Sequence, residues 1–190
     1  VSEMCHWREH TPEEKKEFHH RMGPRFARAS EWVAEKWRKD GVDAFGALVQ
    51  GVVDNGLEAF ATIRMNDVHC LVLEDRKGPY TDKFYRDHPD YRLQQSGGLN
   101  YAIPAVRAHR IACFEEMVRR YPFKGMELDF VRGVPFFPGD NPPNDPHEGE
   151  HPITYPRDYS EGYCPIMTGF IGEIRAMFDR VGQELDRKIE

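Results

Sequence analysis

The sequence predicts an α/β fold, and more specifically a partial (β/α)8 barrel, or TIM barrel, with parallel strands and long top-face loops. First, predicted helices and strands alternate along the chain, an order typical of parallel strands covered by helices. Second, both predicted strands, 57–66 and 125–131, have one apolar face and an opposite face that ends in charged or amide side chains. Third, each strand leads into a long loop rich in aromatic residues, as strands do at the catalytic end of a barrel.

The first part of the chain is predicted to be helical. A helix begins at Thr11, whose hydroxyl caps it ahead of a proline in the first turn. A second helix, over about 25–39, has apolar residues three to four positions apart. A third helix begins near Phe45 and ends in a glycine C-cap at Asn55-Gly56.

The strands are recognised by side chains that alternate between two faces. In the first strand the apolar face carries Leu57, Ala59, Ala61, Ile63 and Met65, and the other face carries Phe60, Thr62, Arg64 and Asn66. In the second strand the apolar face carries Met126, Leu128 and Phe130, and the other face carries Glu127 and Asp129.

The connections contain three more predicted helices. A short helix over about 81–87 precedes a strong helix that begins at Pro104 and is stopped by Pro122. Cys113 lies in the apolar stripe of that helix and is predicted to be a buried free thiol. Residues 133–163 are rich in proline and are predicted to form a loop, and a last helix covers about 166–189.

The chain is expected to be a single domain over 1–190 that is itself a fragment of a larger TIM-barrel catalytic domain. A complete barrel needs about 250 residues and eight strands, and only two strands are convincing here. A smaller open α/β sheet is the alternative. The first residue is Val1 rather than Met, which also suggests a fragment. Because a partial barrel exposes sheet edges and apolar helix faces, self-association is expected.

The composition excludes several classes of protein. The chain has 26 Lys and Arg against 32 Asp and Glu, a formal charge of −6, so it lacks a basic surface for nucleic acid. No stretch approaches the ~18 apolar residues of a membrane span. The four cysteines form no paired motif, and neither an HExxH motif nor a glycine-rich phosphate or dinucleotide loop is present. The leading interpretation therefore includes no cofactor and no metal.

Glu127 and Asp129 are the strongest candidates for chemistry. They lie two residues apart on a predicted strand, so they share a face and are only a few ångströms apart. Paired carboxylates serve as nucleophile or base, as general acid, or as metal ligands. Glu127 is explained as well by a supporting contact with a basic group such as Arg64, whereas function is favoured for Asp129, nearer the strand end. Arg132 either pairs with Asp129 or clamps an anionic substrate.

A second group of polar residues ends the first strand. If Arg64 and Asn66 point inward, Asp67 and His69 lie in the loop just above them. Together these four side chains can hydrogen-bond sugar hydroxyls, hold an anion or bind a cation. The alternative is a polar turn in which Asp67 caps local backbone amides.

Four segments in this order resemble the glycoside-hydrolase-like TIM-barrel proteins of planctomycete-type bacteria, which are related to the bacterial GHL10 group. The segments are ATIRMNDVH at 61–69, FYRDHPDY at 84–91, LNYAIPAVR at 99–107 and GMELDFVR at 125–132. Each segment alone has little specificity, but their joint order is fairly specific. The resemblance implies that the two strands are the third and fourth of the barrel. It also implies that Asp129 and Glu127 are catalytic and that Arg64, Asn66, Asp67 and His69 bind substrate.

The leading hypothesis is a hydrolase that cleaves a glycosidic bond of an oligosaccharide or polysaccharide. Asp129 would act as nucleophile or base, with Glu127 or a residue on another strand as its partner. One alternative is a metal-dependent barrel lyase or isomerase, in which Asp67, His69, Glu127 and Asp129 hold a divalent cation. The other is a non-catalytic sugar-binding protein. The first ten residues lack the features of a signal peptide, but any export signal would lie upstream of Val1. The compartment therefore stays open between the bacterial cytoplasm and the periplasm or exterior.

Overall fold

The computed structural model describes residues 36–37, 39–66, 83–93, 96–130, 135–138 and 157–190. Its elements, in chain order, are α3 (Ala44–Asp54), β1 (Phe60–Arg64), α4 (Lys83–Asp87), the 3-10 turn η1 (Pro89–Tyr91), α5 (Pro104–Arg120), β2 (Gly125–Asp129) and α6 (Arg157–Glu184). β1 and β2 are hydrogen-bonded neighbours and run parallel. The predicted α/β class with parallel strands is therefore confirmed.

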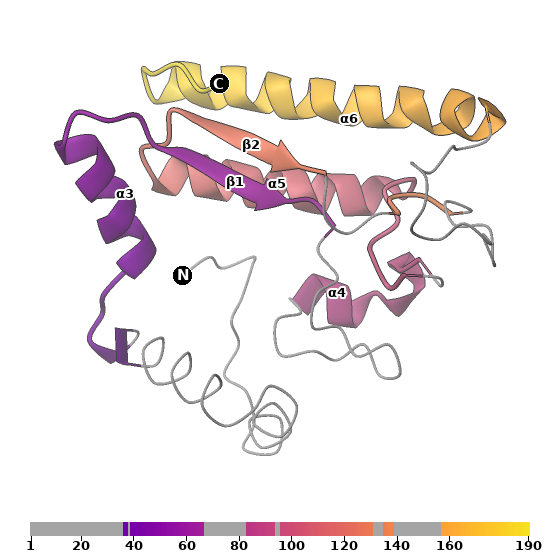
Figure 1. Cartoon of the computed structure of the whole chain (residues 1–190), viewed down its shortest axis with the longest axis horizontal. Coiled ribbons are helices and arrows are strands. Elements are labelled where there is room, and N and C mark those ends of the chain that lie inside the picture. The colour runs from indigo at the N-terminus through magenta and orange to yellow at the C-terminus, as the bar shows by residue number, and fades with distance from the viewer. Residues whose placement is uncertain (1–35, 38, 67–82, 94–95, 131–134, 139–156) are drawn as a thin grey trace, which may run out of the picture.

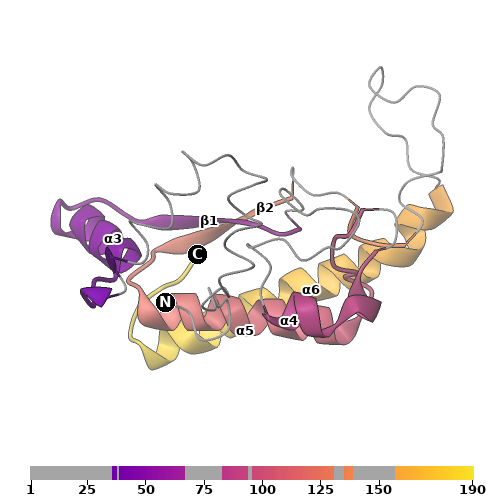
Figure 2. The ribbon, with the colours of Figure 1, turned by 90° about the horizontal axis from the view of Figure 1, so that it is seen from below.

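The helices α5 and α6 cover one face of this sheet. Both strands lie on one side of α4, α5 and α6 (Figures 1 and 2). The apolar face of the strands meets the helices in one core cluster, in which Met65, Phe114 and Phe170 are almost completely buried. Burial alternates along β1, where Ala61 is buried and its neighbours on both sides are exposed. The predicted apolar and polar faces are confirmed within β1 and β2. They are wrong for two residues outside β1: Asn66, predicted on the polar face, is buried, and Leu57, predicted on the apolar face, is exposed.

The helix α3 packs at the beginning of the strands. Asp43 caps its first turn by accepting a hydrogen bond from the Gly46 N–H at 2.9 Å. The helix ends at the predicted Asn55-Gly56 cap, where Gly56 has a φ of 73°. Its buried side chains form a second small cluster with the start of β1 and the residues before β2, namely Val49, Ala59, Ala61 and Phe123.

The helix α5 begins and ends as the two prolines predict, and Cys113 within it is a buried free thiol. Its last turn is held by Arg187, which comes from the segment after α6. The guanidinium donates to the carbonyls of Phe123 at 2.5 Å and Tyr121 at 3.0 Å, and also to Val118. Burial lowers the pKa of Arg187. The carboxyl end of α5 is thereby tied to the end of the chain.

The predicted bounds of α6 were wrong. The helix begins at Arg157 and contains Pro165, so residues 157–163 are helical and do not belong to the loop. Proline is unfavourable in the interior of a helix, so a helix that continues through Pro165 was not expected from the sequence. A long buried stripe that includes Phe170, Ile174 and Val181 anchors the rest of the helix on the core. The free energy gained by this packing is larger than that lost with the one backbone hydrogen bond that a proline removes.

The chain leaves α6 at Glu184 and returns to the sheet, although the sequence predicted helix as far as residue 189. The Met126 N–H donates to the Glu190 carbonyl at 3.0 Å, and the Glu190 N–H donates to the Lys124 carbonyl at 2.8 Å. These two bonds are the pattern of a parallel pair between Glu190 and Gly125. Glu190 therefore lies beside β2 on the edge opposite β1, in the position of a third parallel strand.

Both strands are shorter than predicted, and the first two residues after β1 form a turn. Among the helices of the described ranges, none combines the length and apolar character that crossing a membrane requires.

Candidate functional site

The polar face of the sheet is the face that α5 and α6 leave uncovered. In the parallel register Thr62 is the partner of Glu127, and Arg64 is the partner of Asp129. Partner residues on adjacent strands project to the same face, so these four side chains form one group. Thr62, Arg64 and Glu127 are exposed and Asp129 is half-buried. The structure therefore brings together three of the predicted site residues and adds Thr62 to them.

A hydrogen bond joins the two strands across this face. The Thr62 hydroxyl donates to Glu127 Oε2 at 2.9 Å. The sequence suggested that Arg64 is the supporting partner of Glu127, but the register places Arg64 one pair further along, beside Asp129. Alternation already put Thr62 on the correct face. Only the register, which depends on how the two strands pair, identifies its partner.

The end of β1 is held in place by its pairing with β2. The Met65 N–H donates to the Asp129 carbonyl at 3.0 Å, directly after the Arg64–Asp129 pair. The two charged side chains of that pair thus stand on backbone whose position is determined by the sheet. A guanidinium and a carboxylate in adjacent positions can together bind a polar ligand that has both donors and acceptors.

The side chain of Asn66 has a structural role. Its side chain is 3 % exposed and lies at the carboxyl end of the sheet. Its Nδ2 donates to the carbonyls of Leu99 at 3.1 Å and Pro135 at 2.8 Å, while its Oδ1 accepts from the Leu99 N–H at 2.8 Å. Gly98 makes room for this amide, since a Cβ there would lie 2.6 Å from Nδ2. Both donors of Asn66 are occupied by backbone groups, so we do not include it among the ligand-binding side chains.

Tyr101 completes this link between β1 and the segment that leads into α5. Its hydroxyl donates to the Met65 carbonyl, and its backbone N–H donates to the Phe136 carbonyl at 2.9 Å. Burial raises the pKa of the Tyr101 phenol, and interactions with Arg110 oppose that increase. Tyr101 and Asn66 therefore fix the loops that surround the end of β1. Neither link is predictable from the sequence, because the partners are far apart in the chain.

Three predicted site residues, Asp67, His69 and Arg132, lie outside the described residues. Within the described ranges, no group of three His, Cys, Asp or Glu side chains is placed to hold a metal ion. The described part of the site therefore consists of two carboxylates, one guanidinium and one hydroxyl on an open sheet face. Such a set can exchange protons, stabilise a developing positive charge and hydrogen-bond hydroxyl groups.

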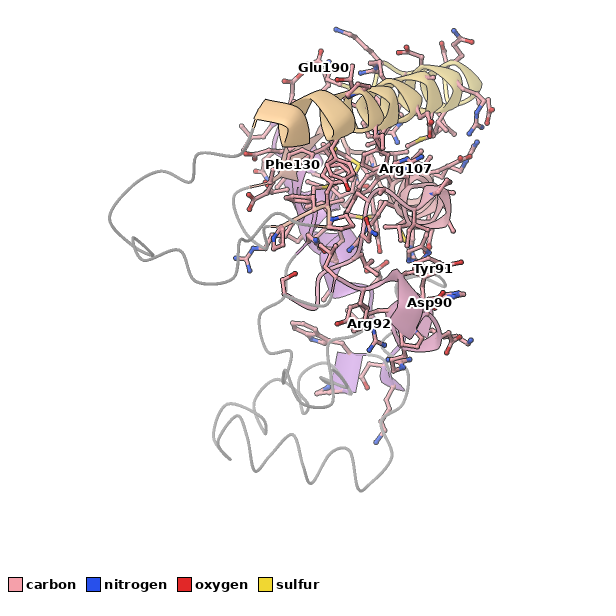
Figure 3. All side chains as sticks on the ribbon, turned by 90° about the vertical axis from the view of Figure 1, so that its right-hand side faces the viewer. Asp90, Tyr91, Arg92, Arg107, Phe130 and Glu190 are labelled. Atoms are coloured by element: carbon pink, nitrogen blue, oxygen red, sulfur yellow. The ribbon has the colours of Figure 1, made fainter. Side chains whose placement is uncertain are left out.

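The side chains near the short helix α4 belong to a different region. In Figure 3, Asp90, Tyr91 and Arg92 lie together, away from Phe130 and α6. Arg92 donates to the Tyr85 carbonyl through Nε at 3.1 Å and lies over the Tyr85 ring, with its Cζ 4.2 Å from the ring centroid. These contacts stabilise the end of α4 and contribute nothing to the polar face.

Comparison of the chain with profiles of known protein families gave no match, and comparison with curated proteins gave none either.

Proposed function

We propose that β1 and β2 are neighbouring strands of a (β/α)8 barrel and that their polar face lines the interior of that barrel. Two observations support this architecture. The strands and Glu190 lie side by side in chain order, and both α5 and α6 lie on the same face of the sheet. A barrel requires this sequential order with all helices outside, whereas an open doubly wound sheet reverses its strand order and has helices on both faces.

The polarity of the open face supports the same architecture. At the beginning of the strands the face carries the Phe60 ring over Gly125, and a Cβ on that glycine would meet the ring at 2.7 Å. The next pair is Thr62 with Glu127, and the last pair, at the carboxyl end, is Arg64 with Asp129. The face thus changes from apolar to charged towards the end at which barrel enzymes have their active sites.

For activity, we propose that the protein hydrolyses a glycosidic bond. The observation that carries this proposal is the presence of Glu127 and Asp129 on one open face of parallel strands, with Asp129 at the carboxyl end. Most glycosidases use two carboxyl groups, one to protonate the leaving oxygen and the other to attack the anomeric carbon or activate water. The resemblance of the four sequence segments to glycoside-hydrolase-like proteins favours the same reaction. Arg64 would hydrogen-bond sugar hydroxyls beside Asp129.

The test is a screen for turnover with a panel of nitrophenyl glycosides and with polysaccharides, in which released nitrophenol and new reducing ends are measured. On the active substrate, Asp129→Asn is expected to lower kcat/KM by about 10²–10⁴-fold. Asp90→Asn is the matched control, because Asp90 is an exposed acid on η1, away from the polar face. That variant is expected to keep the native rate.

Two results would contradict the proposal. One is the absence of turnover on every glycoside and polysaccharide in the panel. The other is hydrolysis that Asp129→Asn leaves unchanged, which would place the chemistry elsewhere. Thermal unfolding of each variant must match that of the native protein, so that a loss of rate is not a loss of fold.

A further inference from the structure

The two carboxylates of the open face have different neighbours on the adjacent strand. Glu127 lies opposite Thr62 and accepts the hydrogen bond from its hydroxyl at 2.9 Å. Asp129 lies opposite Arg64, and paired side chains on adjacent strands start about 5 Å apart. One acid therefore has a neutral hydroxyl as its register partner, and the other has a permanent cation.

A hydroxyl and a guanidinium suit different kinds of carboxyl group. A threonine hydroxyl can donate to the carbonyl oxygen of a carboxylic acid as well as to an oxygen of a carboxylate, so it holds the group in both protonation states. A guanidinium has only donors and is always charged, so it pairs best with a carboxylate that keeps its charge. A group that gives up and regains a proton in every cycle is therefore better supported by the hydroxyl.

We infer that Glu127 is the general acid of the proposed glycosidase reaction and that Thr62 is its positioning residue. This inference rests on the proposed function. Thr62 holds Oε2 of Glu127, so Oε1 is the oxygen that carries the transferred proton. The hydrogen bond also restricts the rotation of an exposed side chain that would otherwise sample several rotamers.

The proton transfer has a simple balance of atoms and electrons. The Oε1–H bond of Glu127 breaks and its proton goes to the glycosidic oxygen, while the bond from that oxygen to the anomeric carbon breaks and leaves its electron pair on the oxygen. Asp129 either attacks the anomeric carbon or takes a proton from the attacking water. One water molecule is consumed in either case, and its hydroxyl ends on the anomeric carbon. When Asp129 attacks the carbon, Glu127 takes the proton of that water, whose hydroxyl then displaces Asp129. When Asp129 acts as the base, Asp129 takes that proton and releases it to solvent, from which Glu127 regains one.

The roles of the two carboxylates can be distinguished with two substrates whose leaving groups differ in their need for a proton. A dinitrophenolate leaves without protonation, whereas a sugar alkoxide needs the proton. The experiment measures kcat and KM for the native protein, Glu127→Gln, Thr62→Val, Thr62→Ser and Asp129→Asn. The two substrates are the dinitrophenyl glycoside and the oligosaccharide of the sugar that is active in the screen. Thr62 and Glu127 are exposed, so these substitutions leave the core intact.

For Glu127→Gln we expect kcat to fall about 10²–10⁴-fold on the oligosaccharide and little on the dinitrophenyl glycoside. Thr62→Val should show the same pattern with a smaller loss of about 10- to 100-fold and a nearly unchanged KM, because the acid is present but misplaced. Thr62→Ser keeps the donor and should stay close to the native rate. Asp129→Asn should impair both substrates alike.

Two patterns would overturn the inference while the glycosidase proposal stands. One is a dependence on the leaving group that appears in Asp129→Asn and not in Glu127→Gln, since the acid would then be Asp129. The other is an equal rate for Thr62→Val and Thr62→Ser, which would remove the positioning role of the hydroxyl. A native protein that hydrolyses neither substrate would instead overturn the proposed function, and the inference with it.

Discussion

The side chain of Asn66 and the backbone of Leu99 hold each other through two hydrogen bonds. Asn66 Nδ2 donates to the Leu99 carbonyl at 3.1 Å, and the Leu99 N–H donates back to Asn66 Oδ1 at 2.8 Å. The same amide reaches the Pro135 carbonyl at 2.8 Å. One buried side chain thus joins the end of β1 to two later segments of the chain, and it does so two residues after Arg64.

This arrangement predicts that Asn66→Asp lowers the free energy of unfolding by about 3 kcal/mol or more. A carboxylate has no N–H to offer, so it would be buried against two carbonyl oxygens. Asn55→Asp is the matched control, because Asn55 also donates through Nδ2 to a carbonyl, that of Gly51 at 2.7 Å, but is exposed. It should cost no more than about 1 kcal/mol. Urea denaturation of the two variants makes the comparison, and equal losses would show that Asn66 is not a buried link.

Asp43 connects α3 to the end of α5 and gives a second prediction. It accepts hydrogen bonds from the Gly46 N–H at 2.9 Å and from the Tyr121 hydroxyl at 2.8 Å. Burial tends to raise the pKa of Asp43, but these two hydrogen bonds together with nearby positive charge, including that of Arg120, outweigh it, and the pKa lies below its ordinary value. Asp43→Ala should therefore destabilise the protein by about 2 kcal/mol, through the lost cap and the unpaired hydroxyl.

The control for Asp43 is Asp54→Ala, at the other end of the same helix. A negative charge is unfavourable near the carboxyl end of a helix, and the exposed Asp54 accepts a single hydrogen bond from the Gln50 side chain. Removing it should leave the stability almost unchanged. Thermal unfolding of both variants tests the difference, and a cost at Asp54 as large as that at Asp43 would argue against the capping explanation.

The sequence predicts those parts of the fold that depend on neighbouring residues. Period-two alternation places Ile63 on the covered face and Thr62 on the open one, and Pro104 begins α5 as expected. Alternation also assigns Asn66 to the open face, but the strand ends at Arg64 and the side chain turns into the interior. Its partners are 33 and 69 positions away, and no local pattern identifies such distant contacts.

The candidate site could likewise be predicted only where it depends on neighbouring residues. The i and i+2 spacing is enough to predict that Glu127 and Asp129 share a face. Which residue stands opposite each of them depends on the register of two strands separated by sixty-five positions, as the hydrogen bond between Thr62 and Glu127 shows. The pairing of Glu190 with β2 could not be predicted for a related reason, because the two hydrogen bonds that show it involve too few residues to produce an alternating pattern.

Glu115 on α5 predicts a dependence of stability on pH. Arg180 of α6 donates to its carboxylate at 2.6 Å and Arg119 donates at 2.8 Å. These hydrogen bonds, that from Arg180 first, hold the pKa of Glu115 below its ordinary value of 4.5. A carboxyl whose pKa is lower in the folded state contributes stability above the unfolded pKa, and this contribution is lost as the pH falls through the folded pKa.

Glu115→Gln should therefore cost about 0.5–1 kcal/mol at neutral pH, a value kept small by solvent screening of these partly exposed side chains. The difference from the native protein should shrink as the pH falls below 4.5 and as salt is added. The control is Glu173→Gln on the exposed surface of α6, which should change stability little at either pH. Urea denaturation at several pH values measures both, and a difference at Glu115 that persists in acid would contradict the ion-pair explanation.

Three chain segments approach one another closely at Gly125, at the beginning of β2, and a substitution there tests this packing. A Cβ on this residue would lie 2.5 Å from the Glu190 carbonyl oxygen and 2.7 Å from the Phe60 ring. Gly125→Ala should therefore destabilise the protein by about 1–3 kcal/mol, because it forces the ring or the Glu190 backbone away. Gly51→Ala in α3 is the control, since its Cβ would meet nothing within 4 Å, and it should stabilise the helix by about 0.5–1 kcal/mol.

A double substitution identifies which neighbour is displaced at Gly125. If the ring is the obstacle, Phe60→Leu should recover part of the loss caused by Gly125→Ala, because the shorter side chain clears the new methyl group. If the losses simply add, the Glu190 backbone has moved and its hydrogen bond with Met126 is weakened. Amide hydrogen exchange at Met126 reports that bond directly.

The turn that ends α6 has an unfavourable backbone conformation that a substitution can relieve. Asp186 has a φ of 50°, and the Arg187 N–H that follows it donates to the Gly182 carbonyl at 2.9 Å, which is the helix-ending geometry that favours glycine. Asp186→Gly should therefore raise the free energy of unfolding by about 0.5–1 kcal/mol. This gain is the free energy recovered by relieving the left-handed backbone conformation, minus the cost of glycine's greater freedom in the unfolded chain. The same change at Asp179, inside α6 and exposed, should instead lower it by about 0.5 kcal/mol. Thermal unfolding should thus move in opposite directions for Asp179 inside α6 and Asp186 in the turn that follows it. A loss at Asp186 would mean that its side chain contributes more than its backbone conformation costs.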